Sequence, residues 1–370
     1  MEFRDLKKQY RVLKTDIDAA INRVVTNTNF ISGKEVGELE ELLAEYVGTK
    51  HCITCANGTD ALVLALKAWG IGQGDAVFVP DFTFFASGEA PALCGATPVF
   101  VDVERDTFNI SSEYLEKAIK QVLNENILIP KVIVTVDLFG QPADYTKIKE
   151  IAEKYGLLVL EDGAQGFGGR IGNKKVGSFG DIATTSFFPA KPLGCYGDGG
   201  AIFTDNDEWD ALIRSYCVHG KGNDKYDNVR IGMNSRLDTI QAAILKVKFE
   251  QFVKYELERI NEIASWYTQM LNEMVITPKI KEGFVSSWAQ YTILCEERDK
   301  LQNELKKWNI PTMIYYRKGL HEQIAFEKKA INVGNYENTK FLSEHVLSIP
   351  IHPYMNKSNV NEIIKRIEIS

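Results

Sequence analysis

The sequence has no long apolar run and no strongly basic stretch. A membrane-spanning helix needs about 20 consecutive, mainly apolar residues, and no segment of this chain meets that requirement. The formal net charge is −7, which argues against nucleic acid as a partner but is compatible with a local anion pocket. The first eight residues are mostly charged and lack the apolar run of a signal peptide. We therefore expect a cytoplasmic protein without a membrane or nucleic-acid partner.

Cysteine and histidine are too sparse for a structural zinc site. The six cysteines lie far apart except for Cys52 and Cys55, and the chain has five histidines. A structural zinc site usually needs a second pair of cysteine or histidine ligands at close spacing, and no such pair is present. We therefore expect no metal, and we expect the cysteines to be reduced.

Two common nucleotide-binding motifs are also missing. The G-x-G-x-x-G fingerprint of a nicotinamide-binding Rossmann domain should follow the first strand, but that spacing does not occur. The glycine clusters at 166–169 and 197–200 lack the third glycine at the required offset, and the P-loop pattern is absent. A nicotinamide-dependent dehydrogenase is therefore not expected.

The elements that are present predict a two-domain α/β protein. With 370 residues, the chain exceeds the size at which a single core usually divides. Between residues 77 and 188, strand-like apolar runs alternate with helical segments, which predicts a largely parallel sheet covered on both faces. We predict a large domain over 1–240, beginning with an amphipathic helical segment. We also predict a small α+β domain over 241–370, which begins with a long helical stretch. Its expected strands are 289–294 and 312–316, and its expected helices are 300–308 and 338–347.

A lysine lies just past one predicted buried strand. Residues 182–188 form a short apolar run, Lys191 follows Ser186 by five positions, and a glycine-rich turn comes next. Lysine is rarely buried unpaired, and desolvation disfavours its ammonium form, which makes the amine a nucleophile. A Schiff base with an aldehyde cofactor uses a lysine in this way. Taken alone, Lys191 is better explained as a surface lysine on a strand-to-loop turn, and only its partners elsewhere in the chain favour the Schiff base.

Candidate partners for such a cofactor follow other predicted strands, where ligands of parallel sheets bind. Asp162 follows the strand-like run 157–160, and an aspartate there can keep the ring nitrogen of pyridoxal phosphate protonated. Gln165 can reach the same ring, and Phe84 can stack on it, with Phe82 and Phe85 as alternatives. A helix cap, a salt bridge or a core aromatic would explain each of these residues individually.

A phosphate site is predicted at the turn formed by Asn57 and Gly58. This turn precedes a helix that begins near Thr59, and free N–H groups at a helix N-terminus favour an anion. The hydroxyl groups of Thr59 and Ser186 can donate further hydrogen bonds. Simple helix capping by Thr59 is the alternative interpretation.

Together these motifs resemble the DegT/StrS family of sugar-nucleotide aminotransferases, which belong to fold type I of the pyridoxal-phosphate enzymes. The resemblance implies pyridoxal 5'-phosphate (PLP) as cofactor and a mostly parallel seven-stranded sheet in the large domain. It extends along nearly the whole chain, over residues 3–6, 57–62, 161–165, 186–200, 234–238 and 349–354.

The resemblance also implies residue roles. Lys191 would attach the cofactor covalently and shuttle protons, and Asp162 would pair with the pyridine nitrogen. Asn234 would reach the phosphate of the other subunit, so that a homodimer shares its active sites. The remaining cofactor-binding residues would be Gly58, Thr59, Phe84, Gln165 and Ser186, and the substrate would contact Arg236, Tyr315, Tyr316 and Arg317.

Residues 187–203 and 234–238 are most similar to aminotransferases that act on UDP-2-acetamido-2-deoxy-3-oxo-glucuronate. Two departures keep a dTDP-linked 3-keto-6-deoxyhexose open as an alternative. Those enzymes tend to have Ala where this chain has Gly163, and His-Tyr-Pro where it has 315–317. L-Glutamate is the expected amino donor, and the product would be an amino sugar for a surface polysaccharide.

Two other classes of protein share the implied fold. PLP-dependent sugar dehydratases carry histidine in place of the lysine, so Lys191 argues against that class. A PLP-binding regulator would need an appended DNA-binding helix-turn-helix and a basic face, and the sequence contains neither.

Overall fold

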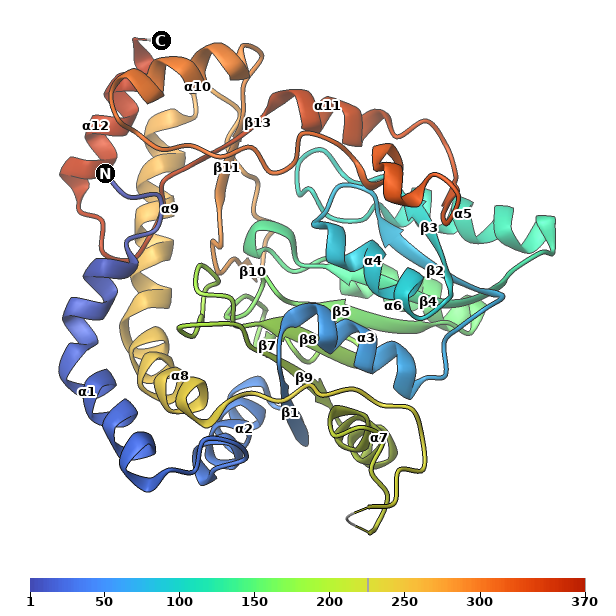
Figure 1. The fold of residues 1–370 in the computed structure, drawn as a ribbon. Coiled ribbons are helices and arrows are strands. Elements are labelled where there is room, and N and C mark those ends of the chain that lie inside the picture. Colours follow the sequence, from blue (N-terminus) through green and yellow to red (C-terminus); the bar gives the residue numbers. More distant parts are fainter. Residues whose placement is uncertain (225, 370) are drawn as a thin grey trace.

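An eight-stranded sheet forms the centre of the computed structural model, which describes residues 1–224 and 226–369 (Figure 1). The strand order is β1-β9-β8-β5-β4-β2-β3-β12, and β9 is the one strand that runs antiparallel to its neighbours. The strands are β1 (His51–Cys55), β2 (Asp75–Pro80), β3 (Thr97–Val101), β4 (Ile129–Val136), β5 (Leu158–Asp162), β8 (Ile182–Ser186), β9 (Gly200–Thr204) and β12 (Ile331–Asn332). The predicted mostly parallel seven-stranded sheet is thereby confirmed, and the two-residue β12, from later in the chain, adds an eighth strand.

The central strands are apolar because both faces of the sheet are covered. Residues 132–136 of β4 are all buried, and all five are β-branched residues that fit a pleated surface. One face packs against α3 (Gly58–Ala68), α4 (Phe85–Leu93) and α7 (Asp207–Cys217). The other packs against α5 (Ser112–Glu125) and α6 (Tyr145–Tyr155), and against α2 (Lys34–Val47) at the β1 end.

The N-terminal segment is helical as predicted, in α1 (Leu6–Asn27) and α2. Buried Leu13 and Ile17 of α1 contact buried Ile244 of α8 (Thr239–Gln251), and α1 lies along α8 in Figure 1. A π-helical turn over Phe252–Glu256 joins α8 to α9 (Leu257–Leu271), so the predicted long helical stretch is interrupted there. None of the helices in the described part of the chain is long and apolar enough to cross a bilayer.

A second core lies in the C-terminal part. The strands β11 (Tyr291–Leu294) and β13 (Val346–Ile349) pair antiparallel, and α9, α10 (Arg298–Lys307) and α12 (Lys357–Glu368) pack with them. Between α10 and β13 the chain returns to the main sheet, where Leu320, Phe326 and α11 (Glu337–His345) pack against its core. The division into 1–240 and 241–370 stays a prediction. Three two-residue strands, β6 (Arg170–Ile171), β7 (Lys174–Lys175) and β10 (Phe284–Val285), form a small third sheet.

Two local predictions for this part are wrong. Residues 312–316 do not form a strand, because only Met313 forms a bridge, to Ser348. The helix expected over 338–347 ends at His345, and residues 346–349 continue as β13.

Candidate active site at the carboxyl edge of the sheet

A cavity of about 430 Å³ lies where the parallel strands end. The register explains how its walls meet. Gly200 of β9 pairs with Cys55 on one side and with Ser186 on the other, so β1 and β8 end at the same edge of the sheet, on either side of β9. Nine of the predicted residues line this cavity: Gly58, Thr59, Phe84, Asp162, Gln165, Ser186, Lys191, Tyr315 and Tyr316.

The turn before α3 has the close approach expected of a phosphate site. Asn57 caps the helix, because its Oδ1 accepts a hydrogen bond from Asp60 N at 2.8 Å. A Cβ on Gly58 would lie 2.8 Å from Ser186 Cβ, so a glycine is required for the helix start and the end of β8 to come together. N–H groups in the first turn of a helix have no intrahelical partner and are available to an anion.

Asp162 ends β5 and is 6% exposed. Its Oδ2 accepts a hydrogen bond from Ser87 Oγ at 2.8 Å, and its Oδ1 accepts one from Ala164 N at 3.2 Å. Burial raises the pKa of Asp162, whereas the Ser87 hydrogen bond and the positive charge of Lys191 oppose that rise. The sequence analysis did not identify Ser87, although its position in an apolar helix directly after β2 was a usable signal.

Lys191 lies in the loop after β8, which folds back on itself. Lys191 N donates to Phe188 O at 2.9 Å, and Cys195 N donates to Phe187 O at 2.8 Å. Burial lowers the pKa of Lys191, and the carboxylate of Asp162 partly offsets that effect. The amine is thus less basic than an exposed lysine, as a nucleophile in a desolvated site should be.

The opposite wall holds Gln165 and Tyr316. Gln165 Oε1 accepts from Phe139 N at 2.8 Å, and Gln165 Nε2 donates to Tyr316 Oη at 3.2 Å. Of the three aromatic candidates for ring stacking, Phe84 lines the cavity and is 54% exposed, whereas Phe82 is fully buried against Tyr316. Phe85 packs on Phe326 instead, with ring centroids 4.8 Å apart.

Three predicted residues do not line the cavity. Asn234 is exposed and Arg236 is half-buried, both in the loop before α8, so their predicted roles require the site of a second subunit. Arg317 turns towards α10, where Nη2 donates to Gln302 Oε1 at 3.2 Å and Nη1 lies 3.6 Å from Asp299 Oδ1. Conversely, the cavity is also lined by residues to which the sequence had suggested no role, among them Ser87, Phe188, Asp198 and Gln290.

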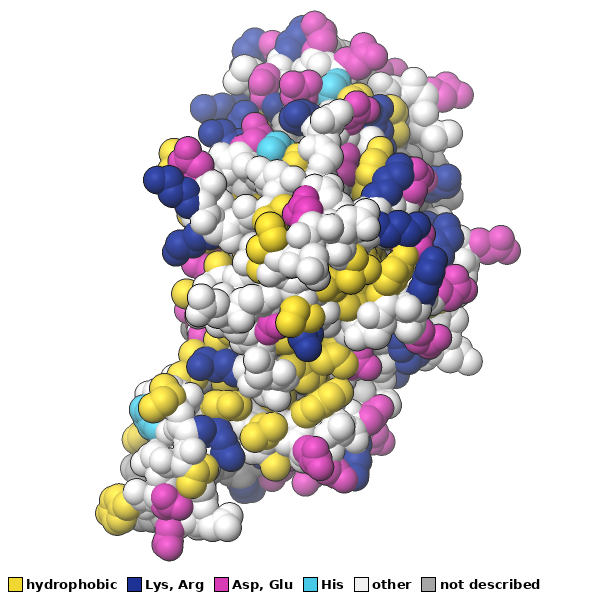
Figure 2. All heavy atoms as spheres, turned by 90° about the vertical axis from the view of Figure 1, so that its right-hand side faces the viewer, with side chains coloured by type: hydrophobic (Ala, Val, Ile, Leu, Met, Phe, Trp, Pro, Cys, Tyr) yellow, Lys and Arg dark blue, Asp and Glu magenta, His cyan; other side chains and the backbone are white. Residues whose placement is uncertain are grey.

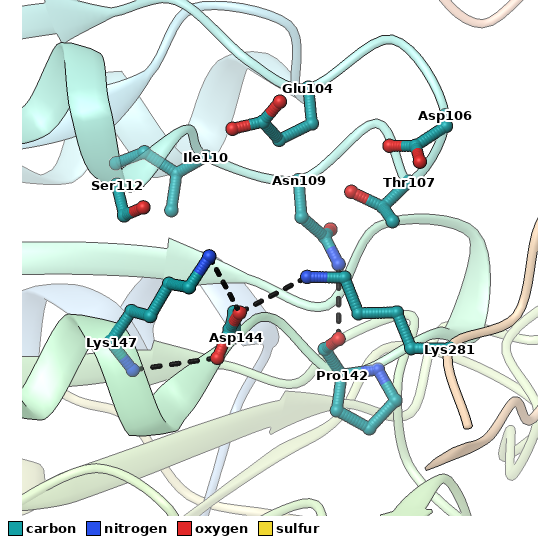
Figure 3. A pocket seen from close by; sticks show the side chains of 10 residues that line it. All are labelled: Glu104, Asp106, Thr107, Asn109, Ile110, Ser112, Pro142, Asp144, Lys147 and Lys281. Carbon is teal, nitrogen blue, oxygen red and sulfur yellow. Dashed lines mark hydrogen bonds and ion pairs between the residues drawn. The ribbon is translucent and has the colours of Figure 1, made fainter. Parts of the chain in front are cut away.

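A second cavity, of about 190 Å³, has a different character (Figure 3). It is lined mainly by charged and polar side chains, and none of the predicted site residues is among them. Asp144 lies 3.1 Å from Lys281 Nζ and 3.9 Å from Lys147 Nζ, and Asn109 donates to Pro142 O at 3.2 Å. Both lysines of this cavity lie near the Asp144 carboxylate, and we assign no chemistry to the cavity.

The sequence pattern of the DegT/DnrJ/EryC1/StrS aminotransferase family matches residues 12–368. The chain belongs to this family. It is 44% identical, over 98% of both chains, to UDP-2-acetamido-2-deoxy-3-oxo-D-glucuronate aminotransferase of Pseudomonas aeruginosa. It is 34% identical to dTDP-3-amino-3,4,6-trideoxy-alpha-D-glucose transaminase of Streptomyces venezuelae, over 99% of this chain and 94% of that protein.

Solved structures agree with this assignment. A DegT/DnrJ/EryC1/StrS aminotransferase from Brucella abortus superimposes with a TM-score of 0.98 at 48% identity, covering 100% of this chain and 98% of the other. NtdA from Bacillus subtilis, solved with the bound cofactor PMP, superimposes with a TM-score of 0.88 at 28% identity, covering 96% and 81%. The protein is therefore a PLP-dependent aminotransferase of fold type I.

The residues that line the main cavity fit PLP. The start of α3 at Gly58, with the Thr59 and Ser186 hydroxyl groups, suits the phosphate, and Asp162 suits the ring nitrogen. When bound, PLP provides an electron sink for the negative charge that develops beside the reacting amino group. Lys191 Nζ, with its lowered basicity, can take up and release a proton at the reacting carbon. Asp162, whose ionised form the Ser87 hydrogen bond favours, would hold a proton on the ring nitrogen.

Proposed function

We propose that this aminotransferase transfers the amino group of L-glutamate to the 3-keto group of a UDP-linked sugar of the 2-acetamido-2-deoxy-3-oxo-glucuronate type. The observation that carries this proposal is the 44% identity, along 98% of both chains, with the Pseudomonas aeruginosa enzyme of that specificity. The product would be an amino sugar used in the cytoplasm to build a lipopolysaccharide, an O-antigen or another surface glycan.

A uronate substrate requires a positively charged side chain at the cavity. Its carboxylate needs a cation, and Lys191 is the one basic side chain among the described residues that line the cavity. Lys191 is committed to the cofactor, and Arg317 is turned towards Asp299. We therefore propose that Arg236 of a second subunit supplies this charge, since a guanidinium binds a carboxylate through two parallel hydrogen bonds.

A homodimer with shared active sites follows from this proposal. Exposed apolar side chains flank the cavity, with Phe84 54% and Phe188 52% exposed, as expected of a surface that a partner covers. Figure 2 shows hydrophobic side chains gathered across the middle of one face of the molecule. Two-fold symmetry would give two equivalent sites.

Hybrid dimers test the shared site. A Lys191→Ala protein and an Asn234→Ala/Arg236→Ala double variant should each be inactive. Mixing them with verified subunit exchange should restore up to about a quarter of wild-type activity, because one site of each hybrid then has a full set of residues. Exchange without any recovery would contradict sharing.

A substrate screen tests the specificity. Glutamate-dependent amination should be measured with UDP- and dTDP-linked 3-keto and 4-keto sugars, with mass spectrometry of the product. The proposal expects the highest kcat/KM with the UDP-linked 3-keto uronate. A preference for a neutral dTDP-linked 3-keto-6-deoxyhexose, the specificity class nearer to the Streptomyces venezuelae relative, would overturn it.

A further inference from the structure

The cavity wall that contains Tyr315 and Tyr316 belongs to a segment anchored on both sides. Before the wall, Met313 N donates to Ser348 O at 3.1 Å, and Ser348 N donates to Met313 O at 2.8 Å. After the wall, Leu320 N donates to Asp81 O at 2.9 Å. The wall residues themselves form no strand, so these two anchors determine where they lie.

The second anchor contains a buried carboxylate and an imidazole. Asp81 directly follows β2 and is fully buried. Its Oδ1 accepts a hydrogen bond from His321 N at 2.8 Å, and its Oδ2 lies 2.6 Å from His321 Nδ1. A carboxylate only accepts, so Nδ1 carries the hydrogen. The two residues are 240 positions apart in the chain.

The residues around the Asp81–His321 contact pack closely against it. The His321 ring stacks on the Tyr336 ring, with centroids 4.3 Å apart and planes 16° apart. A Cβ on Gly319 would overlap the Asp81 carboxylate and would lie 2.7 Å from His321 Nδ1, so only glycine allows this approach. An isolated buried carboxylate is costly, and here the hydrogen bonds from His321 offset that cost.

Asp102, the neighbouring carboxylate at the same sheet edge, binds a different part of the chain. Asp102, after β3, accepts hydrogen bonds from Thr339 N at 2.9 Å and Asn338 N at 3.0 Å, so it caps α11. Asp102 therefore attaches the returning chain at a point beyond the wall, whereas Asp81 attaches it where the wall ends. The Asn338 side chain, which donates to Val103 O at 2.7 Å, offers a matched control.

Both sides of the Asp81–His321 contact continue into the active site. On one side, the chain runs from Asp81 to Phe82 and on to Phe84 in the cavity wall. On the other side it includes Tyr316, whose ring lies edge-on to Phe82 at 5.9 Å. Tyr316 Oη in turn accepts a hydrogen bond from Gln165, which lies three residues after Asp162, the last residue of β5.

We propose that the Asp81–His321 contact is a positioning device for the aminotransferase reaction, which fixes the Tyr315–Tyr316 wall at the correct separation from the Phe82–Phe84 segment after β2. Asp81 and His321 are positioning residues, because neither lines the cavity. The device acts through Tyr316 and Gln165, which then face bound cofactor and substrate. The proposal rests on the aminotransferase activity but not on the identity of the sugar.

Two substitutions at His321 separate its contributions. His321→Phe keeps a ring to stack on Tyr336 but removes the Nδ1–H donor. His321→Asn loses the ring but places an amide N–H donor near the position of Nδ1. The holoenzyme of each variant, with Asn338→Ala as control, should be measured for amide hydrogen exchange, kcat, KM and thermal unfolding.

We expect exchange of the amides between residues 313 and 321 to quicken at least tenfold in His321→Phe, with kcat/KM at least tenfold lower. In His321→Asn, both quantities should stay within about threefold of wild type, and Asn338→Ala should change neither. Wild-type exchange and kcat/KM in His321→Phe would overturn the proposal. So would equal losses in both His321 variants that follow their unfolding temperatures, because that pattern indicates only a structural role.

The exchange measurement does not depend on the substrate. If wild-type enzyme aminates none of the UDP- or dTDP-linked keto sugars, the proposed function fails, and local exchange in the two His321 variants still decides for or against the anchor.

Discussion

Ser87 Oγ donates a hydrogen bond of 2.8 Å to Asp162 Oδ2, although the two residues are 75 positions apart and lie on different elements, α4 and β5. The contact is buried on both sides. It stabilises the ionised form of Asp162 against the effect of its burial, and the ionised form is the one that can hold a proton on the cofactor ring nitrogen.

Ser87→Ala should therefore shift the pH dependence of the reaction. Loss of the hydrogen bond removes an influence that lowers the pKa of Asp162, so that pKa rises further. Activity requires the carboxylate and is lost as pH falls through its pKa. The acid limb of the kcat/KM profile should consequently move to higher pH. The free energy behind this rise in the pKa of Asp162 should be about 1.5–3 kcal/mol, the range for a hydrogen bond to a charged group. Ser87→Thr, which keeps the hydroxyl, is the control, and an unchanged acid limb in Ser87→Ala would contradict this role.

Lys191→Ala should abolish turnover without unfolding the protein. The substitution removes the nucleophile and the proton carrier, whereas the fold around the loop depends on backbone hydrogen bonds such as Cys195 N to Phe187 O. The amination rate tests the loss of turnover, and far-UV circular dichroism tests whether the fold is retained. Lys120→Ala, at an exposed position on α5, is the control. Retention of wild-type turnover would exclude Lys191 as the catalytic lysine.

Arg236 and Arg317 should respond differently to substitution. If Arg236 binds a uronate carboxylate in the partner's site, Arg236→Ala should lower kcat/KM for the uronate by about 1.5–3 kcal/mol and largely spare a neutral 6-deoxy analogue. Arg317→Ala should change kcat/KM little for either sugar, because Arg317 forms exposed contacts with Asp299 and Gln302. An equal loss on both sugars in Arg236→Ala would instead place this residue near the diphosphate or the cofactor.

The buried carboxyl group of Asp137 should make stability depend on pH. Its Oδ1 accepts hydrogen bonds from Ala143 N and Tyr145 Oη, both at 2.9 Å, while its Oδ2 has no partner. Burial, with the charge of nearby Glu161, holds the pKa of Asp137 well above its ordinary value. Burial likewise raises the pKa of Glu161 to about 7. Both groups thus favour the protonated state more in the folded chain than in the unfolded one.

The contribution of these two groups to stability should therefore be greatest below the unfolded value of about 4 and should fall as pH rises through the window up to the folded pKa values. Asp137→Asn keeps the accepting oxygen and removes one of these charges. We expect it to unfold at least about 2 °C above wild type at pH 8 and at the same temperature near pH 4, measured by calorimetry. Asp144→Asn, on the same loop but half-buried, is the control. A gain that persists at pH 4 would point to packing instead of charge.

The alternation of strands and helices along the large domain could be predicted because its signals are local. Strands that are buried on both faces are almost continuously apolar, and β2 and β3 have that pattern after their first residue. Lys191 and Asp162 were predictable for a related reason. A polar residue placed just past a buried strand is at the carboxyl edge of a parallel sheet wherever that strand lies.

Short apolar runs were ambiguous by the same reasoning. Residues 346–349 are compatible with the end of a helix or with a strand, and only pairing with β11 makes them a strand. Residues 312–316 are suited to a strand, but only Met313 finds a partner. Tyr315 and Tyr316 then serve as cavity wall.

By itself, the sequence determined the α/β class, the strand ends and the family, because burial and turn chemistry act between residues close together in the chain. Only the tertiary structure decided that Ser87 meets Asp162, that Asp81 meets His321 and that Arg317 turns away from the cavity. Such contacts depend on which strands are neighbours and on the direction in which each side chain leaves its element. Neither property is encoded within a short stretch of residues, since each is settled by packing of the whole core.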